Sequence, residues 1–314
     1  MDPLGTVLAT AAVEGSVAAS VRAGDVWGLR LAEVPGAAFH AITAGTATLT
    51  LEGHPSLRLV PGDAVLLPFG DDHVLASGPG APVRDFDHVR AEAAIADGGE
   101  VVVGDGPAST QVICASYRLD PAATVTPFAG LPRVLHVPAL SAPPALRSSL
   151  ALIADELARP GPGVRAVLDH VVNVVLIQVL RVWIEDPDRP AGPPSWLRGL
   201  ADPVTSRALG ELHDDPGHPW TVGSLARRVG VSKATLARRF EAEVGRPPGD
   251  YVTAWRMELA AHRLRRGSEP VGAIGRGVGY QSEYAFNRAF ARYHGVPPGR
   301  FRAAARATAP APAS

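Results

Sequence analysis

Cysteine and lysine are almost absent from this sequence of 314 residues, which contains one of each. With Cys114 as its single cysteine, the chain can form no intramolecular disulfide, as is usual for proteins of a reducing compartment. The sequence also lacks a secretory signal pattern and any run of 18 consecutive apolar residues. These absences predict a cytoplasmic protein with no membrane partner.

Positive charge is scarce in the first part of the chain and abundant in the last. Residues 1–190 hold 12 arginines against 21 acidic residues, a net charge of −9. Residues 191–314 hold 17 arginines and one lysine against 10 acidic residues, a net charge of +8, which agrees with −1 for the whole chain. A basic segment is attracted to nucleic-acid phosphates, whereas an acidic one is repelled.

A linker pattern lies where the charge changes sign. Glu185–Ser195, EDPDRPAGPPS, is rich in Pro and Asp and has almost no apolar residues. The length of the chain is sufficient for two domains. We therefore expect one domain in residues 1–190, a second in residues 196–306, and a disordered Ala/Pro tail in residues 307–314.

The basic part contains a helix-turn-helix pattern near its end, in Gly277–Arg302, GVGYQSEYAFNRAFARYHGVPPGRFR. Ser282 is a suitable N-cap, and Phe286 and Phe290 form an apolar i, i+4 pair on the helix that follows. A shorter apolar helix pattern precedes Gly279, which supplies the turn. The outward face of the second helix carries Glu283, Tyr284, Asn287 and Arg288.

The same pattern occurs upstream in Trp220–Phe240, WTVGSLARRVGVSKATLARRF. Gly230 supplies the turn, Ser232 caps the second helix, and Leu236 and Phe240 form its apolar pair. Its outward face carries Lys233, Ala234, Thr235, Ala237 and Arg238. A longer helix, residues 248–266, connects the two units. Two such units on one connecting helix favour DNA reading over simple helix packing.

Residues 204–302 resemble the DNA-binding domain of the AraC family of bacterial transcription regulators. The resemblance rests on the motifs PWTVGSLARRVGVSKATLARRF, YVTAWRMELAAHRL and VGYQSEYAFNRAF…GVPPGRFR. It implies that both second helices enter successive major grooves of double-stranded promoter DNA. The residues that would reach bases are Ala234, Ala237, Arg238, Glu283, Tyr284, Asn287 and Arg288. Because alanine contacts only a thymine methyl group, base reading by the first unit would depend mainly on Arg238.

The N-terminal part has the pattern of a β-barrel or β-sandwich, with short apolar segments separated by turn signals such as Gly45 and Gly53. The predicted strands are Val26–Leu31, Ala38–Thr43, Ala47–Leu51, Leu57–Val60 and Ala64–Leu67. Two helices are expected after them, Ala145–Ala158 and Val164–Asp186.

The barrel also resembles a cupin. Gly62–Ser77, GDAVLLPFGDDHVLAS, is similar to the second cupin motif, and Phe39–Gly45, FHAITAG, stands where the first motif would be. The sequence departs from these motifs, because the His-x-His pair is reduced to His40, the following glutamate is missing, and Ser77 replaces an asparagine. With VICASYRLD further on, the pattern resembles the cupin-type sensor domain of one branch of AraC-like regulators, which extends the resemblance over nearly the whole chain.

His40, His73 and Cys114 are the candidate effector-binding residues. If all three project into the barrel, they would line an effector pocket, in which Cys114 would also be a candidate redox-sensitive thiol. The same three side chains would alternatively bind a zinc ion, the one cofactor that the sequence suggests. In a third interpretation, His73 only fixes a turn and Cys114 is a small buried apolar residue.

The second predicted helix, Val164–Asp186, is apolar on nearly every side. Such a helix must be buried from several directions. We expect part of it, including Val175 and Val179, to meet a second subunit in a homodimer. The alternative is a helix sandwiched between the barrel and the DNA-binding domain.

The sequence as a whole predicts an α+β fold, in which a cupin-like β-barrel and its helices precede an all-α domain with two helix-turn-helix units. The expected function is sequence-specific DNA binding by a transcription regulator that responds to a small-molecule or redox signal and contacts RNA polymerase if it is an activator. We identify no catalytic residue. The alternative is a metal-dependent cupin enzyme fused to a DNA-binding module, although His40, His73 and Cys114 are its only candidate ligands.

Overall fold

The computed structural model describes residues 2–308 except for 88, 90, 92, 95–99, 120–125 and 191. The chain divides into two compact units. The barrel unit comprises Glu14–Arg118 and Leu131–Pro190, and the helical unit comprises Met1–Val13, Leu119–Gly130 and Ala191–Ser314. Most of the tail predicted to be disordered lies outside the described residues, and the last helix, α12, runs to Thr308.

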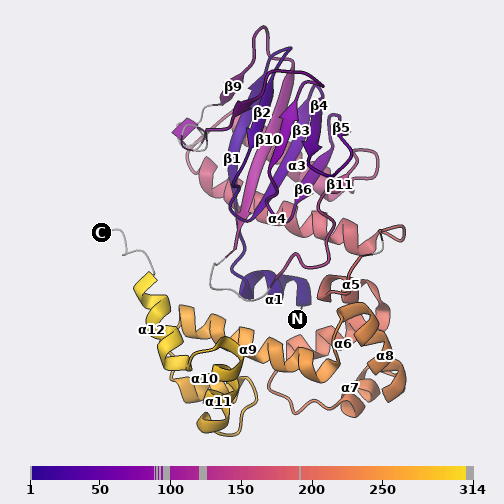
Figure 1. The fold of residues 1–314 in the computed structure, drawn as a ribbon, viewed down its shortest axis with the longest axis vertical. Helices are drawn as coiled ribbons and strands as arrows, with labels where there is room; N and C mark the ends of the chain where they lie inside the picture. Colours follow the sequence, from indigo (N-terminus) through magenta and orange to yellow (C-terminus); the bar gives the residue numbers. More distant parts are fainter. Residues whose placement is uncertain are drawn as a thin grey trace. The chain divides into compact units, whose positions relative to one another are not determined.

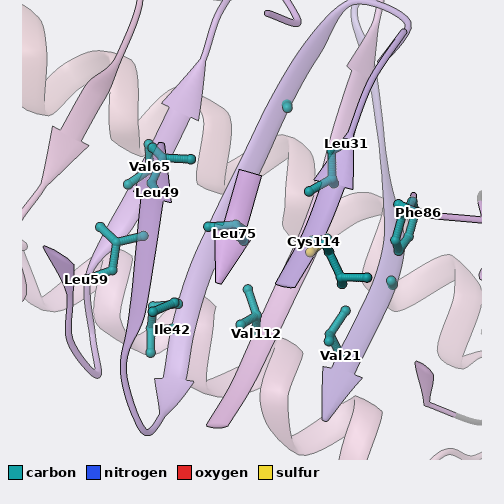
Figure 2. Close-up of a cluster of buried hydrophobic side chains, with 14 of the residues drawn as sticks. Val21, Leu31, Ile42, Leu49, Leu59, Val65, Leu75, Phe86, Val112 and Cys114 are labelled. Carbon is teal, nitrogen blue, oxygen red and sulfur yellow. The ribbon is translucent and has the colours of Figure 1, made fainter. Parts of the chain in front are cut away.

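Two β-sheets form the barrel unit (Figure 1). The first sheet has the strand order β11-β6-β3-β10-β1-β9, and the second has the order β5-β4-β7-β2-β8. The strands are β1 (Glu14–Ala23), β2 (Gly28–Leu31), β3 (Ala37–Ala44), β4 (Ala47–Leu51), β5 (Leu57–Leu59), β6 (Ala64–Leu67), β7 (His73–Ala76), β8 (Arg84–Asp85), β9 (Val101–Val103), β10 (Thr110–Arg118) and β11 (Leu135–Val137). Buried side chains of both sheets, among them Leu49, Leu75, Val112 and Cys114, form one apolar core (Figure 2).

The predicted strands agree with the structure at β4 and β6 and differ at the start of β2. Val26 makes only an isolated bridge to Asp105 and its side chain is 55% exposed, so the strand begins at Gly28. The longest strand, β1, was not predicted. Its sequence, EGSVAASVRA, consists largely of Ala, Ser and Gly, which have little intrinsic preference for strands.

Helices α3 (Pro144–Ala158) and α4 (Val164–Glu185) follow the strands and pack against each other. Among the described residues, α4 is the one helix with the length and apolar composition of a membrane span. Its apolar side packs against β1, and the Asn173 side-chain oxygen accepts a hydrogen bond of 3.0 Å from the main-chain N–H of Gly15. Val175 and Val179 are buried within the unit. Their assignment to an intersubunit face was therefore wrong.

The helical unit contains α1 (Pro3–Thr10) and the helices from α5 to α12. These are α5 (Trp196–Ala201), α6 (Pro203–Asp214), α7 (Val222–Val229), α8 (Lys233–Val244), α9 (Pro248–Arg266), α10 (Val271–Gly277), α11 (Glu283–His294) and α12 (Pro298–Thr308). Figure 1 shows α7 and α8 near one end of α9, and α10 and α11 near the other end. The long helix α9 contacts both α8 and α11 and so connects the two helix pairs, as the sequence predicts.

The first helix of the chain belongs to the helical unit, although the sequence boundary at residue 190 placed it with the barrel. Asp2 caps α1 by accepting a hydrogen bond from the main-chain N–H of Leu4. The helix packs on α6 and α9, with Val7 2% exposed, and His262 of α9 donates to the carbonyl oxygen of Thr10 at 3.2 Å. Strand β1 starts only four residues after α1 ends, at Glu14.

Candidate functional site

Local side-chain hydrogen bonds fix the first helix-turn-helix unit. Thr221 and Ser224 form a reciprocal capping box at the start of α7, with N–H to oxygen distances of 3.0 and 2.9 Å. Gly230 then adopts the left-handed conformation, with φ of 77°, that the turn requires. The hydroxyl of Ser232 accepts from the N–H of Thr235 at 3.1 Å and starts α8, as predicted.

The second unit repeats this arrangement, with a close approach between its two helices. Gly279 has φ of +91°, and the hydroxyl of Ser282 caps α11 by accepting from the N–H of Ala285 at 3.2 Å. A Cβ atom at Gly275 would lie only 2.8 Å from the ring of Phe286, so α10 and α11 reach this separation only with glycine there. Phe286 and Phe290 are fully buried, which confirms the apolar side predicted for α11.

The predicted DNA-reading residues occupy the outward sides of α8 and α11. On α8, Lys233, Ala234 and Arg238 are exposed and Thr235 and Ala237 are half-buried. On α11, Glu283, Tyr284 and Arg288 are exposed and Asn287 is half-buried.

The two arginines at these surfaces differ in their surroundings. Arg238 forms no ion pair or hydrogen bond with any residue that the structure describes. The guanidinium carbon of Arg288 lies 5.8 Å from the centre of the Tyr284 ring, a cation–π distance. The second unit therefore presents an arginine paired with an aromatic ring, whereas Arg238 and Lys233 of the first unit are exposed cations.

The structure brings His40, His73 and Cys114 together. Cys114 of β10 is the register partner of His40 on β3, which places both side chains on the same face of the first sheet. His73 comes from β7 of the second sheet. The Nε2 atoms of His40 and His73 are 2.7 Å apart, and Nδ1 of His40 is 3.2 Å from the Cys114 sulfur. The three residues therefore form a hydrogen-bonded bridge between the sheets.

Burial keeps this bridge uncharged. Burial and the nearby His73 lower the pKa of His40 well below its usual value, and burial lowers that of His73. Burial also raises the pKa of the Cys114 thiol to about 12. At neutral pH both imidazoles are neutral and the thiol keeps its proton.

The three side chains do not fit a cupin metal centre. His40 directs one ring nitrogen to Cys114 and the other to His73, so one ion cannot bind all three groups at the usual zinc distances. Within the part of the chain that the structure describes, no three His, Cys, Asp or Glu side chains form a group suited to a metal.

A cavity of about 240 Å³ lies in the barrel unit beside His40 and Cys114. Its wall includes Ala18, where the pairing of β1 with β10 shifts register in a β-bulge. Sequence reasoning missed Ala18 and the other lining residues of β1 because it did not predict that strand. The apolar residues Val17, Ala19 and Val21 at alternate positions were the signal available in the sequence.

Two sheets with a cupin-like arrangement, joined to two helix-turn-helix units on one connecting helix, define a DNA-binding regulator with a cupin-like N-terminal domain. Residues 2–185 match the family described as Cupin, and residues 225–304 match the family described as Helix-turn-helix domain. Over 310 residues the chain is 38% identical to a putative AraC-like transcription regulator of Streptomyces antibioticus, covering 96% of this chain and 98% of the relative. The chain belongs to the AraC family of transcription regulators.

A second full-length relative and one solved structure extend the comparison. The RCS-specific HTH-type transcriptional activator RclR of Escherichia coli (strain K12) is 28% identical over 315 residues, covering 99% of this chain and all of the relative. The DNA-binding domain of AdpA, solved in complex with a target DNA, is 28% identical with a TM-score of 0.33, and the match covers 35% of this chain and 98% of that one. Because the relatives that match over the whole chain are named as transcription regulators, the chain is a transcription regulator and not an enzyme.

Proposed function

We propose that this regulator reads promoter DNA with the outward sides of α8 and α11, and that a small molecule in the barrel cavity changes its action on transcription. The observation that carries the DNA part is the pair of exposed helix faces held by one connecting helix, α9. The match of residues 225–304 to the helix-turn-helix family supports this assignment. Arg238 and Arg288 are the residues that we assign to guanine recognition.

A small molecule fits the barrel better than an oxidant as the signal. Oxidation of a cysteine proceeds through the thiolate, and low-pKa, exposed cysteines are the reactive ones. Cys114 is 3% exposed, and its pKa of about 12 leaves almost no thiolate at neutral pH. The neighbouring cavity, by contrast, has room for a small organic compound.

The regulator acts as a cytoplasmic homodimer in this proposal. The inward side of α4 is buried by its own unit, whereas Val174 of α4 and Leu152 of α3 are 46% and 43% exposed. Large apolar side chains exposed on neighbouring helices favour a protein contact. We assign the outer surface of α3 and α4, defined by Leu152 and Val174, to the dimer. RNA polymerase is a further partner if the protein activates transcription.

Strand β1 lines the cavity and also contacts α4, so it connects the ligand site to the proposed dimer surface. Ser16 and Ala18 of β1 line the cavity, and Gly15 of the same strand is hydrogen-bonded to Asn173 of α4. A ligand that binds one arrangement of β1 more tightly shifts the population of dimer arrangements by its difference in affinity.

Selection from a randomised DNA library by the full-length protein tests the proposal. We expect enriched sites with two conserved segments about 10 bp apart for each protomer, since two recognition helices on one duplex face are separated by one helical turn. Binding without enrichment of any sequence would contradict it.

A further inference from the structure

The cavity beside His40 has an apolar wall. The side chains that form it include Ala18, Leu31, Val34, Ala38, Phe86 and Ala115. Figure 2 shows Cys114 among the apolar side chains of this region, between Leu31 and Phe86. At its rim the cavity has one residue of each charge, Glu33 and Arg118, both exposed to solvent. Inside this rim, the polar side chains among the described lining residues are those of His40, Cys114, Ser16 and Ser116.

The main-chain carbonyl group of Asp71 determines which atoms of His73, His40 and Cys114 carry protons. Nδ1 of His73 lies 2.7 Å from the main-chain oxygen of Asp71, and a carbonyl oxygen only accepts, so this nitrogen carries the proton. In the neutral ring the other nitrogen, Nε2, is then an acceptor, and Nε2 of His40 donates to it at 2.7 Å. Nδ1 of His40 is therefore an acceptor, and the Cys114 thiol donates to it at 3.2 Å.

These proton positions determine which hydrogen-bond donors remain free to bind a ligand in the cavity. Both ring nitrogens of His40 are already engaged, and the one hydrogen of the Cys114 thiol points at His40. The bridge thus has no free N–H or S–H for an anion, and it carries no negative charge for a cation. Enclosing an unpaired charge in such surroundings is unfavourable.

We propose that the cavity takes an uncharged and largely apolar molecule, and that His73, which lies behind His40, sets this preference by fixing the protons on His40 and Cys114. The inference rests on the proposed sensing function and adds the chemical class of the ligand. His73 is a positioning residue in this scheme, because it acts on the cavity only through His40.

Two dyes with the same ring system test the ligand class in the full-length protein. N-phenyl-1-naphthylamine is uncharged, and 1-anilinonaphthalene-8-sulfonate carries an additional sulfonate. Ser116→Phe fills the cavity, and Ser56→Phe is a matched change at an exposed position. For each dye, the fluorescence that is lost in Ser116→Phe but kept in Ser56→Phe reports binding in the cavity. The uncharged dye should bind this site about tenfold or more tightly than the sulfonate.

Other outcomes of the dye measurement overturn the inference in distinguishable ways. Equal binding of both dyes, with both lost in Ser116→Phe, would refute the uncharged class and retain the cavity as a binding site. Binding of neither dye, or fluorescence unchanged by Ser116→Phe, would remove the cavity as a ligand site. Circular dichroism and thermal unfolding show whether the variant barrels are folded, and DNA binding by the same samples tests the regulator function separately.

An infrared spectrum tests the role of His73. The S–H stretching band belongs to Cys114 alone, since the chain has no other cysteine. In the wild type this band should show a thiol that donates to a nitrogen acceptor. His73→Leu removes the acceptor from Nε2 of His40, so the band should move towards that of a free thiol and the preference for the uncharged dye should shrink.

His73→Gln is the matched rescue, because its amide oxygen accepts a hydrogen bond as the imidazole nitrogen does. This variant should keep both the wild-type band and the dye preference. An unchanged band in His73→Leu, or the same shift in both variants, would show that His73 does not fix the proton on Cys114.

Discussion

The hydroxyl group of Tyr117 donates a hydrogen bond of 2.9 Å to the main-chain carbonyl oxygen of Val172. Tyr117 lies three residues after Cys114 on β10, and Val172 lies in α4. Because burial raises the pKa of Tyr117, the hydroxyl remains a donor throughout the physiological range. This buried bond and the Gly15–Asn173 bond attach β10 and β1, two neighbouring strands that line the cavity, to α4.

Tyr117→Phe should lower the free energy of unfolding by about 1–2 kcal/mol, because it removes a buried hydrogen bond and keeps the ring. Urea denaturation measures the loss. Tyr284→Phe, at a side chain 71% exposed, is the control and should change stability by no more than about 0.5 kcal/mol. Equal losses in the two variants would show that the Tyr117 bond contributes nothing specific.

Arg238→Ala and Arg288→Ala should each cost about 1–3 kcal/mol of binding to the selected DNA site and relax the base preference at one position. Arg300→Ala, at an exposed position on α12, should weaken binding to all sequences alike. Arg302 is unsuitable for this control, because it donates to the carbonyl oxygen of Glu269. Binding to a randomised library distinguishes the effects, and a uniform loss for Arg238→Ala would identify a phosphate contact.

Val174→Glu should produce a folded monomer, because it places charges on the outer surface of α3 and α4 that we assign to the dimer. Val175→Glu, one residue further, should instead unfold the barrel unit, since Val175 is fully buried there. Analytical ultracentrifugation and thermal unfolding separate the two results. A dimer that persists in Val174→Glu would place the subunit contact elsewhere.

Lowering the pH from 7 to 5 should destabilise the helical unit. Burial lowers the pKa of His213 to about 3 from an ordinary value of 6.5, so the unfolded chain takes up a proton in this range that the folded chain does not. The contribution to stability is full above pH 6.5 and decreases by up to about 1.4 kcal/mol per pH unit as the pH falls towards 3. His40 and His73 act in the same direction in the barrel unit.

Below pH 6.5, His213→Gln should reduce the slope of the unfolding free energy against pH by about 1.4 kcal/mol per pH unit, which corresponds to one proton. Chemical denaturation followed at several pH values provides the slope. His213 stacks on Trp255, with ring centres 4.1 Å apart, so some stability is lost at every pH, but only the titration changes the slope. An identical slope in the variant would exclude His213 as its source.

Cys114 should react with iodoacetamide far more slowly in the native protein than in the urea-unfolded chain. The reactive species is the thiolate, and a pKa of about 12 leaves about one part in ten thousand of it at pH 8. Intact-mass measurements over time provide both rates. Rapid native alkylation would return Cys114 to the list of redox-sensing candidates.

Local signals in the sequence sufficed for the helix-turn-helix units. Ser232, Gly230 and Ser282 act through neighbours a few residues away, so the sequence alone predicts both turns and both recognition helices. The alternating pattern of β4 and the continuous apolar run of β6 likewise predict these two strands. The resemblance to cupins brought His40, His73 and Cys114 to attention before their positions were known.

The features that the sequence did not predict depend on contacts between residues far apart in the chain. The small residues of β1 form a strand because β10 and β9 pair with it on either side, and nothing within EGSVAASVRA shows those partners. The direction of Val175 was misjudged for a related reason, since a helix apolar on all sides does not reveal which side its own sheet covers. The hydrogen bonds of His40 depend on two strands far apart in sequence, so the order of its protons needed the structure.

Helix α1 has a consequence for how the molecule is made. Its residues are synthesised before the barrel, yet Leu4, Val7 and Leu8 are buried against α6 and α9, which are synthesised only after the barrel. The apolar side of α1 therefore stays without its packing partners until α6 and α9 have been synthesised. A contact between segments so far apart in sequence is slow to form, so the helical unit is completed only after the barrel has been synthesised.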